Sequence, residues 1–259
     1  MTIRELKQLK TKKGRDEMAL FMIEGEKLVQ EIPHSFNVIK YVVSESFAAG
    51  HERDILIYSN RAKCDVVRDS AFDGLADTVT PQGLIAVCEK KVFGVGDVLA
   101  PRIDGLKHFI ILCENLNDPG NIGALVRTAA AAGATGVILT TGSADIYNPK
   151  VLRAAAGAVL RLPFIVDITL EDAFEHIKSN LKLPIYVAHP RGEVMPYNLD
   201  LQNSFCLLVG NESHGVSEAA AAQADCLVTL PMANNTESLN ASVAGSILMY
   251  EAVRQRTMV

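Results

Sequence analysis

Three segments of this 259-residue chain place polar residues, with glycine in two of them, between an apolar run and a helical pattern, an arrangement suited to holding a ligand. The first is ENLNDPGNIGALVRTA, residues 114–129. Asn121 has the residue type of a helix N-cap, and Gly133 has that of a helix end. Arg127 stands alone among Ala, Leu and Val, and because helical side chains lean towards the N-terminus, its guanidinium can reach back to the loop. A capping asparagine beside a surface arginine is the simpler interpretation.

The second segment is VGNESHGVS, residues 209–217, in which two glycines flank the carboxylate of Glu212. Such a turn is typical of a backbone that brings its N–H groups close to a ligand. The third segment is LPMANNTESLN, residues 230–240, where amides and hydroxyls gather before a long apolar helix. Ser217 and Ser238 have the residue type of helix caps, but the third segment holds more polar groups than one cap needs.

Other sites common in α/β proteins are missing from the sequence. Neither G-x-G-x-x-G nor G-x-x-x-x-G-K-[ST] occurs, which removes most support for dehydrogenases and P-loop enzymes. H-E-x-x-H, G-x-S-x-G and the EF-hand loop are also absent, and the six histidines have no ligand spacing, so no metal is predicted. The five scattered cysteines form no C-x-x-C pair, which favours a reducing cytoplasm. No apolar run approaches the roughly eighteen residues that cross a membrane, so no membrane partner is predicted.

The elements that must position these segments form an alternating pattern after about residue 106. Short apolar runs alternate there with helical patterns, which predicts a mainly parallel sheet covered by helices on both faces. A ligand is expected at the carboxyl ends of its strands. The predicted strands are 108–113, 136–140, 163–167, 184–189, 205–209 and 226–230, and the predicted helices are 121–132, 149–158, 170–180, 217–223 and 239–255.

In the N-terminal part, short apolar runs and helical patterns predict a smaller α/β or α+β unit. Its predicted helices are 3–12, 25–32 and 60–69, and its predicted strands are 19–23, 37–43, 55–58 and 84–88. Residues 94–105 contain three Gly and a Pro without a sustained period, which is typical of a linker. We therefore predict a domain over 1–95, a linker over 96–106 and a second domain over 107–259.

The net charge of −5 conceals a strong asymmetry along the chain. Residues 1–15 carry a net charge of +5, so the rest of the chain carries −10. A basic terminal helix is often no more than a solvated amphipathic helix. The alternative interpretation is an arm that contacts phosphates, for which the candidate residues are Lys7, Lys10, Lys12, Lys13 and Arg15.

At the three segments the sequence resembles the SpoU (TrmH-like) family of RNA ribose 2′-O-methyltransferases, within the SPOUT superfamily. ENLNDPGNIGALVRTA, LLVGNESHGVS and LPMANNTESLNASVAGSILMYEA match the three motifs of that family in order and spacing. The N-terminal part resembles the family's small ribosomal-protein-like RNA-binding domain, at GR (14–15), FMIEG (21–25) and TPQG (80–83). The resemblance covers nearly the whole chain.

The resemblance implies an α/β fold whose C-terminal segment forms a deep trefoil knot, a feature that sequence periodicity does not predict. It also implies S-adenosylmethionine as cofactor, bound in the knot largely by backbone groups, with contacts at Gly210, Leu230 and Leu239. A homodimer through the knot domain is a third implication. The small residues of the last predicted helix, between 241 and 246, allow close packing there or in the core.

The implied reaction transfers the sulfonium methyl group of the cofactor to a ribose 2′-hydroxyl in RNA. This hydroxyl is a poor nucleophile at neutral pH, so the site must orient it and favour loss of its proton. Arg127 is the implied activator of the hydroxyl. Because a guanidinium resists deprotonation, a phosphate clamp or an oxyanion stabiliser is the alternative to a general base. The resemblance assigns the catalytic cluster to Asn121, Arg127, Glu212, Ser238 and Asn240.

Ribosomal RNA is favoured as the substrate because a separate N-terminal domain on a linker resembles the ribosomal-RNA members of the family. Transfer RNA is the alternative substrate. A noncatalytic RNA- or ribosome-binding module of the same fold and a small-molecule α/β enzyme are the alternative functions.

Overall fold

The computed structural model describes residues 1–99 and 107–257, and the chain packs as two units. The N-terminal unit consists of Met1–Val92 together with Tyr147–Leu160. The C-terminal unit consists of Phe93–Ile146 and the chain from Arg161 onward. The segment 147–160, which lies within the second predicted domain, therefore packs with the first unit.

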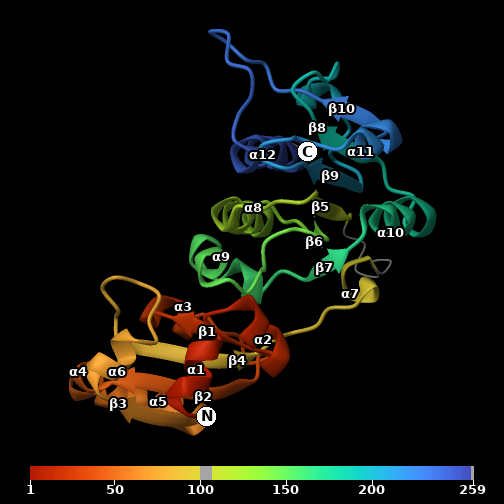
Figure 1. Ribbon diagram of the computed structural model, residues 1–259. Coiled ribbons are helices and arrows are strands. Elements are labelled where there is room, and N and C mark those ends of the chain that lie inside the picture. Colours follow the sequence, from red (N-terminus) through yellow and green to blue (C-terminus); the bar gives the residue numbers. More distant parts are fainter. Residues whose placement is uncertain (100–106, 258–259) are drawn as a thin grey trace. The chain divides into compact units, whose positions relative to one another are not determined.

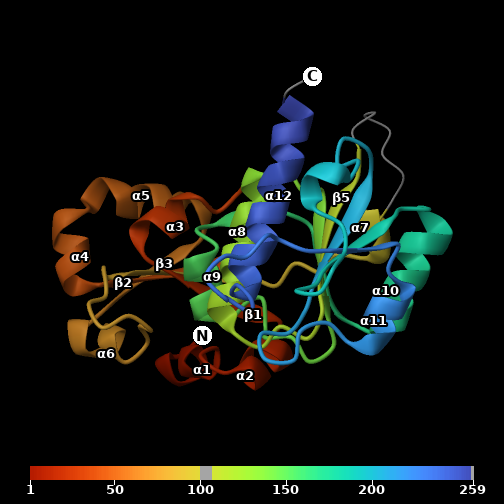
Figure 2. The same ribbon diagram turned by 90° about the horizontal axis from the view of Figure 1, so that it is seen from above.

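The N-terminal unit is built on a four-stranded sheet in the order β1-β4-β2-β3 (Figure 1). β4 is antiparallel to β1 and β2, and β3 is an edge strand parallel to β2. A core that contains Leu6, Val42 and Phe72 joins α1 and α6 to one face of this sheet, and Figure 2 shows α3 and α5 on the other. The strands are β1 (Leu20–Glu24), β2 (Val38–Ser44), β3 (Lys63–Val67) and β4 (Leu84–Glu89). The helices are α1 (Ile3–Gln8), α2 (Lys12–Met18), α3 (Glu26–Gln30), α4 (Glu45–Gly50), α5 (Glu52–Arg61), α6 (Asp69–Asp73), α9 (Pro149–Ala154) and a 3-10 turn at Ala158–Leu160.

The basic N-terminal segment forms two short helices, α1 and α2, so the single helix predicted over 3–12 is wrong. A Cβ on Gly14 would lie 2.1 Å from the carbonyl oxygen of Gln8, so only glycine allows α2 to pass the end of α1 so closely. Arg15 is buried, and its guanidinium donates to the carbonyl oxygen of Leu9 at 2.9 Å. Arg15 therefore ties the two helices together.

Two other predicted elements of this unit have the wrong type. Residues 55–58, predicted as a strand, lie in α5, and residues 60–69, predicted as a helix, contain β3. Leu56 and Ile57 are 66% and 63% exposed, and of the apolar run that indicated a strand only Tyr58 is buried in the core. A run of this length does not distinguish a strand from a helix segment by its periodicity.

The C-terminal unit is built on a six-stranded sheet in the order β10-β8-β9-β5-β6-β7 (Figure 1). Every described strand pair in it is parallel, which confirms the predicted sheet type. Its strands are β5 (Phe109–Cys113), β6 (Gly136–Thr140), β7 (Phe164–Ile168), β8 (Ile185–Ala188), β9 (Phe205–Val209) and β10 (Cys226–Val228). Its helices are α7 (Val95–Leu99), α8 (Pro119–Ala131), α10 (Leu170–Glu175), a π-helical turn at His176–Asn180, a 3-10 turn at Pro196–Asn198, α11 (Glu218–Gln223) and α12 (Ala241–Thr257).

Alternate residues of these strands face two different helical layers. Ile110 of β5 belongs to a core cluster with Phe174 of α10. On the opposite face α12 packs beside α8, as Figure 2 shows, and it also packs on β9. A Cβ on Gly245 would lie 2.6 Å from Leu125 and 3.0 Å from Val209, so the small residue in α12 lets these three elements meet.

The predicted linker over 96–106 begins within α7, and its residues 100–106 lie outside the described part of the chain. α7 packs on β6 and β7 of the C-terminal unit. Within the described ranges, no helix has both the length and the apolar character to cross a bilayer.

Candidate cofactor pocket and active site

Three loops meet at the carboxyl edge of the parallel sheet. β5 lies between β9 and β6, so the loop after β5 (114–118) has a neighbour on each side. From the loop after β9 (210–217), Asn211 Nδ2 donates to the carbonyl oxygen of Asn115 at 2.7 Å. From the loop after β6, Gly142 approaches so closely that a Cβ there would lie 2.7 Å from Asn115 Oδ1. The parallel sheet thus brings distant polar segments together, as expected.

Glu212 ties the loop after β9 to the loop after β5. Its carboxylate accepts the backbone N–H groups of Asn117 and Asp118 at 3.2 and 3.0 Å, and the Asn121 amide at 3.0 Å. Burial by itself would raise the pKa of Glu212, but these hydrogen bonds hold the pKa below its ordinary value. The stability that these hydrogen bonds contribute is therefore fully present above the ordinary pKa of a glutamic acid. It is lost as the pH falls through the lowered pKa of Glu212.

Asn121 is the buried centre of a polar network. Its predicted role as N-cap of α8 is wrong, because Asp118 holds that position and accepts the Asn121 backbone N–H at 2.9 Å. The Asn121 side chain points elsewhere, and its Oδ1 accepts Nδ2 of Asn240 at 2.9 Å and Oγ of Ser242 at 3.2 Å. Asn121, Asn240 and Glu212 are three of the five predicted catalytic residues, and hydrogen bonds join them.

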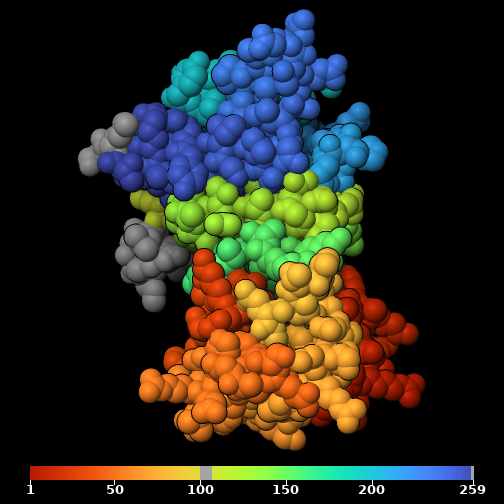
Figure 3. Space-filling model, turned by 90° about the vertical axis from the view of Figure 1, so that its left-hand side faces the viewer, coloured from red at the N-terminus to blue at the C-terminus, as the bar shows by residue number. Residues whose placement is uncertain are grey.

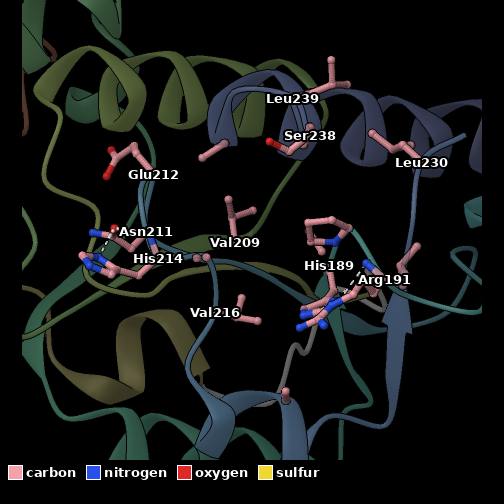
Figure 4. Close-up of a pocket in the computed structure, with 18 of the residues that line it drawn as sticks. His189, Arg191, Val209, Asn211, Glu212, His214, Val216, Leu230, Ser238 and Leu239 are labelled. Atoms are coloured by element: carbon pink, nitrogen blue, oxygen red, sulfur yellow. Dashed lines mark hydrogen bonds between the residues drawn. The ribbon is translucent and has the colours of Figure 1, made fainter. Parts of the chain in front are cut away.

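A cavity of about 610 Å³ lies beside this network, within the range usual for small-molecule sites (Figure 4). Figure 4 shows Glu212 and His214 on one side of it and His189 and Arg191 on the other. Val209 of β9 lies between the two sides. All three predicted cofactor contacts line the cavity, together with two predicted catalytic residues: Gly210, Leu230, Leu239, Glu212 and Ser238.

The wall that follows β9 is a tight backbone hairpin. Asn211 and Gly215 exchange two backbone hydrogen bonds of 2.9 Å, and Gly215 has a φ of 71°, in the region that favours glycine. A Cβ on Gly210 would lie 2.5 Å from the backbone of Gly215 and Val216. At Gly210 the wall therefore has bare backbone, which suits the cofactor that the resemblance implies, because the resemblance implies binding largely by backbone groups.

Arg127 lies outside both the cavity wall and the network. It is exposed on α8, and among the described residues no hydrogen bond or ion pair holds its guanidinium. The described residues that line the cavity do not include it. The sequence predicted that this guanidinium reaches back to the loop before α8. Among the described residues of one chain, no hydrogen bond joins it to that loop.

Comparison with known proteins assigns this arrangement to a family. Residues 108–250, more than half of the chain, match the SpoU rRNA Methylase family. The chain belongs to this family. Residues 1–86 match the MRM3-like substrate binding domain. The SpoU family that the three polar segments indicated is confirmed, and so is the presence of an N-terminal substrate-binding domain.

Two known proteins resemble the chain over nearly its whole length, and a third resembles its larger part. The 23S rRNA guanosine 2′-O-methyltransferase RlmP of Bacillus subtilis is 33% identical, with 96% of this chain and 94% of the relative covered. The SpoU methyltransferase AviRb from Streptomyces viridochromogenes, solved in complex with AdoMet, has a TM-score of 0.86 at 25% identity and covers 98% of this chain and 97% of its own. A structure that concerns 2-OH methylation on tRNA has a TM-score of 0.54 at 26% identity and covers 59% of this chain and 99% of its own. The SPOUT-type α/β fold is confirmed, whereas the knot stays a prediction.

Some residues of the SpoU-type site were not singled out in the sequence. Ser242 joins the Asn121 network from α12, and His189 and Arg191 line the cavity after β8. The available signal was the stretch HPRG, another polar, glycine-containing segment at the end of an apolar strand. It precedes no helical pattern comparable with the other three, so it did not stand out.

One group of possible metal ligands occurs within the described ranges, outside the SpoU-type site. Glu26, His51 and Asp54 of the N-terminal unit offer ligand atoms that lie within 4.8 Å of one another. The ring of His51 stacks on Phe47, and its Nδ1 lies 2.9 Å from the Phe47 carbonyl oxygen. The cavity belongs to the other unit, and we assign this group no part in the reaction.

Alanine substitutions at Ser238 and Asn240 should separate a role in the cavity from a role as a helix cap. Asn240 accepts the backbone N–H groups of Ser242 and Val243 at 2.9 and 3.3 Å, so it caps α12, the role considered for Ser238. Asn240→Ala should lower the free energy of unfolding by about 1 to 2 kcal/mol. Ser238→Ala should leave stability unchanged and slow methyl transfer, because its hydroxyl lines the cavity. Denaturant unfolding and single-turnover transfer measure the two effects, and equal destabilisation by both variants would contradict the assignment.

Proposed function

We propose that the chain transfers a methyl group from S-adenosylmethionine to a ribose 2′-hydroxyl of ribosomal RNA. The observation that carries the proposal is the cavity at the carboxyl edge of the sheet. Gly210, Leu230 and Leu239 line it, and Glu212 connects its wall to the network around Asn121. The relatives support the reaction, since RlmP is a 23S rRNA methyltransferase and AviRb was solved with AdoMet.

We assign structural roles to some of these residues and roles toward the substrate to others. When bound, S-adenosylmethionine supplies the methyl group on its sulfonium. Glu212 and Asn240 are engaged with other protein groups, so they hold the walls in place. Ser238 presents a hydroxyl at the cavity and helps to orient the ribose. Arg127 supplies a positive charge that either clamps an RNA phosphate or stabilises the developing oxyanion while the hydroxyl proton passes to solvent water, since arginine stays protonated in proteins.

Ribosomal RNA is the favoured substrate because of the N-terminal domain. The tRNA-related structure covers only 59% of this chain, whereas the 23S rRNA methyltransferase RlmP aligns with 96% of it. An N-terminal substrate-binding domain is therefore shared with the relative that acts on ribosomal RNA. Transfer RNA is the second candidate substrate.

Binding and mapping experiments test the proposed function together. Calorimetric titration should show that the chain binds S-adenosylhomocysteine, the product form of the cofactor. Mapping 2′-O-methyl groups in total RNA from a deletion strain and its parent should reveal one ribosomal site that loses its methyl group. Failure to bind S-adenosylhomocysteine would favour a noncatalytic RNA-binding module, and loss of a tRNA methyl group would favour transfer RNA.

The lysines of α1 and α2 are the proposed phosphate contacts of the N-terminal unit. Lys7, Lys12 and Lys13 are exposed. Lys10 donates from Nζ to the carbonyl oxygen of Ala76 at 2.7 Å, and Arg15 is buried, so these two side chains are held by the fold. Lys13 also forms an exposed ion pair with Glu17 at 3.7 Å. Lys7, Lys12 and Lys13 carry the proposal because phosphate contacts require ammonium groups at the surface.

Replacing Lys7, Lys12 and Lys13 together with glutamine should weaken RNA binding and leave cofactor binding unchanged. Each lost phosphate contact reduces the slope of log affinity against log salt by about 0.7 to 0.9, so the triple variant should lower it by about 2. Filter binding over a salt series measures the slope. Unchanged RNA affinity would leave α1 and α2 as solvated helices only.

A homodimer through α12 completes the proposal. Val243, Ile247 and Tyr250 are 46%, 45% and 54% exposed and form one stripe along the helix at helical spacing. The surface of α12 and of the neighbouring α8 is visible in Figure 3. α8 also carries Arg127, which lies outside the cavity of its own copy. Pairing through this face supplies a guanidinium to the site from a second chain.

Replacing Ile247 with glutamate should convert the dimer to a monomer, because a charge would be buried in an apolar contact. Sedimentation velocity measures the change in mass. Methyl transfer should fall with dimerisation, while denaturant unfolding of the monomer should show little loss of stability because Ile247 is half exposed. A variant that stays dimeric at micromolar concentration would place the interface elsewhere.

A further inference from the structure

Glu114 is a buried acidic residue that the proposed chemistry does not use. It directly follows β5 and is 8% exposed. Its backbone N–H donates to the carbonyl oxygen of Val209 at 2.9 Å, which extends the pairing of β5 with β9 by one residue. Its side chain reaches the same neighbour further on, where Oε2 accepts the backbone N–H of Ser217 at 3.0 Å. Glu114 is thus attached to both ends of the loop after β9.

Ser217 stands where the cavity wall becomes a helix. Its Oγ accepts the backbone N–H of Ala220 at 3.1 Å and caps α11. All residues from 209 to 218 line the cavity, whereas Glu114 is not among its described lining residues. The hydrogen bond that the Ser217 backbone N–H donates to Glu114 therefore holds the wall although Glu114 itself does not line the cavity.

Two carboxylates, those of Glu212 and Glu114, attach the loop after β9 to the chain around the end of β5. Glu212 reaches from the hairpin to the backbone after β5, and Glu114 reaches from the end of β5 to the exit of the hairpin. Residues 212–215 and Ser217 are exposed, so few apolar contacts fix the wall between the two ties. Hydrogen bonds to a charged acceptor stabilise a loop by more than those to a neutral acceptor.

We infer that Glu114 is a positioning residue for cofactor binding. Its carboxylate holds Ser217, and through it the hairpin from Gly210, in the form that accepts an S-adenosyl ligand, without touching that ligand. The inference rests on the proposed function, which names this cavity as the S-adenosylmethionine site.

Variants of Glu114 test the inference through the affinity for S-adenosylhomocysteine, measured by calorimetry. Glu114→Ala removes the acceptor, so the Kd should rise by about tenfold or more. Glu114→Gln keeps an oxygen that accepts the Ser217 N–H, so its Kd should stay within about threefold of the unchanged chain. In the transfer assay the KM for S-adenosylmethionine should rise in Glu114→Ala, with a smaller change in kcat. If Glu114→Ala does not fold, Glu114→Asp shortens the side chain and provides the same comparison.

Asp225 offers a control at the amino ends of the strands, away from the cavity at their carboxyl ends. Its carboxylate accepts the backbone N–H of Ile185 at 2.8 Å, at the amino end of β8. Asp225→Ala should weaken the fold without changing the Kd. The inference is overturned if Glu114→Ala binds as tightly as the unchanged chain, or if Asp225→Ala weakens binding equally. No binding by the unchanged chain would instead overturn the proposed function, and this inference with it.

Discussion

Replacing Arg127 with alanine should lower the rate of methyl transfer by about a hundredfold or more, with little change in the affinity for S-adenosylhomocysteine. Removing one donor that stabilises a developing oxyanion typically costs a factor of this size. The cofactor should bind normally because Arg127 is not among the described residues that line the cavity. Single-turnover transfer to RNA and calorimetric titration measure the two quantities separately.

Two further variants make the Arg127 result specific. Arg53→Ala removes an exposed arginine from α5, in the other unit, and should leave single-turnover transfer unchanged. Arg127→Lys keeps the charge but loses the planar, two-pronged guanidinium, so it should recover only part of the rate. Near-normal transfer by Arg127→Ala would remove this residue from the catalytic site. Loss of cofactor affinity in the same variant would show that the guanidinium contacts the cofactor.

Replacing Gly210 with alanine should strongly weaken cofactor binding while the fold is retained. The added Cβ would lie 2.5 Å from the backbone of Gly215 and Val216, and backbone cannot move aside as a flexible side chain can. The hairpin must therefore open, at a cost of about 1 to 3 kcal/mol, and the cavity wall moves with it. Calorimetry with S-adenosylhomocysteine should show a Kd raised by about a hundredfold or more.

Gly133 provides the control for Gly210→Ala. It follows α8 with a φ of 77°, and a Cβ there would meet nothing within 4 Å. Gly133→Ala should cost about 1 to 2 kcal/mol of backbone strain and leave the Kd unchanged. If Gly210→Ala binds the ligand as tightly as Gly133→Ala does, the hairpin is not the wall that holds the cofactor.

The fold of the C-terminal unit was largely predictable because its central strands β5, β6 and β9 are buried on both faces. Such strands are continuous apolar runs, and FCLLV before Gly210 is one example. Parallel strands place their following loops at one edge, so a ligand was expected there. The family resemblance implied Gly210, Leu230 and Leu239 as cofactor contacts, and these residues line one cavity at that edge. The N-terminal unit was less predictable, because its elements are short and Leu56 and Ile57 are apolar yet exposed.

Side-chain partners are the part of the site that sequence patterns did not resolve. Asn121 has the residue type of an N-cap, and only the position of Asp118 shows that Asn121 is instead the centre of a network. Arg15 belongs to a basic stretch, yet it is buried against Leu9. In both cases residue type allows two roles, and neighbouring structure selects one of them.

The sequence by itself determined the alternation of strands and helices, the three polar loops and the family to which they belong. Those features are local, since each depends on residues within one strand, turn or helix. Only the tertiary structure decided that Glu212 binds Asn121, 91 positions away, and that Asn240 binds Asn121 across 119 positions. It also decided that Arg127 stays outside the cavity of its own chain. The physical reason is that a side chain's partners depend on how separate elements pack, and no local pattern records that packing.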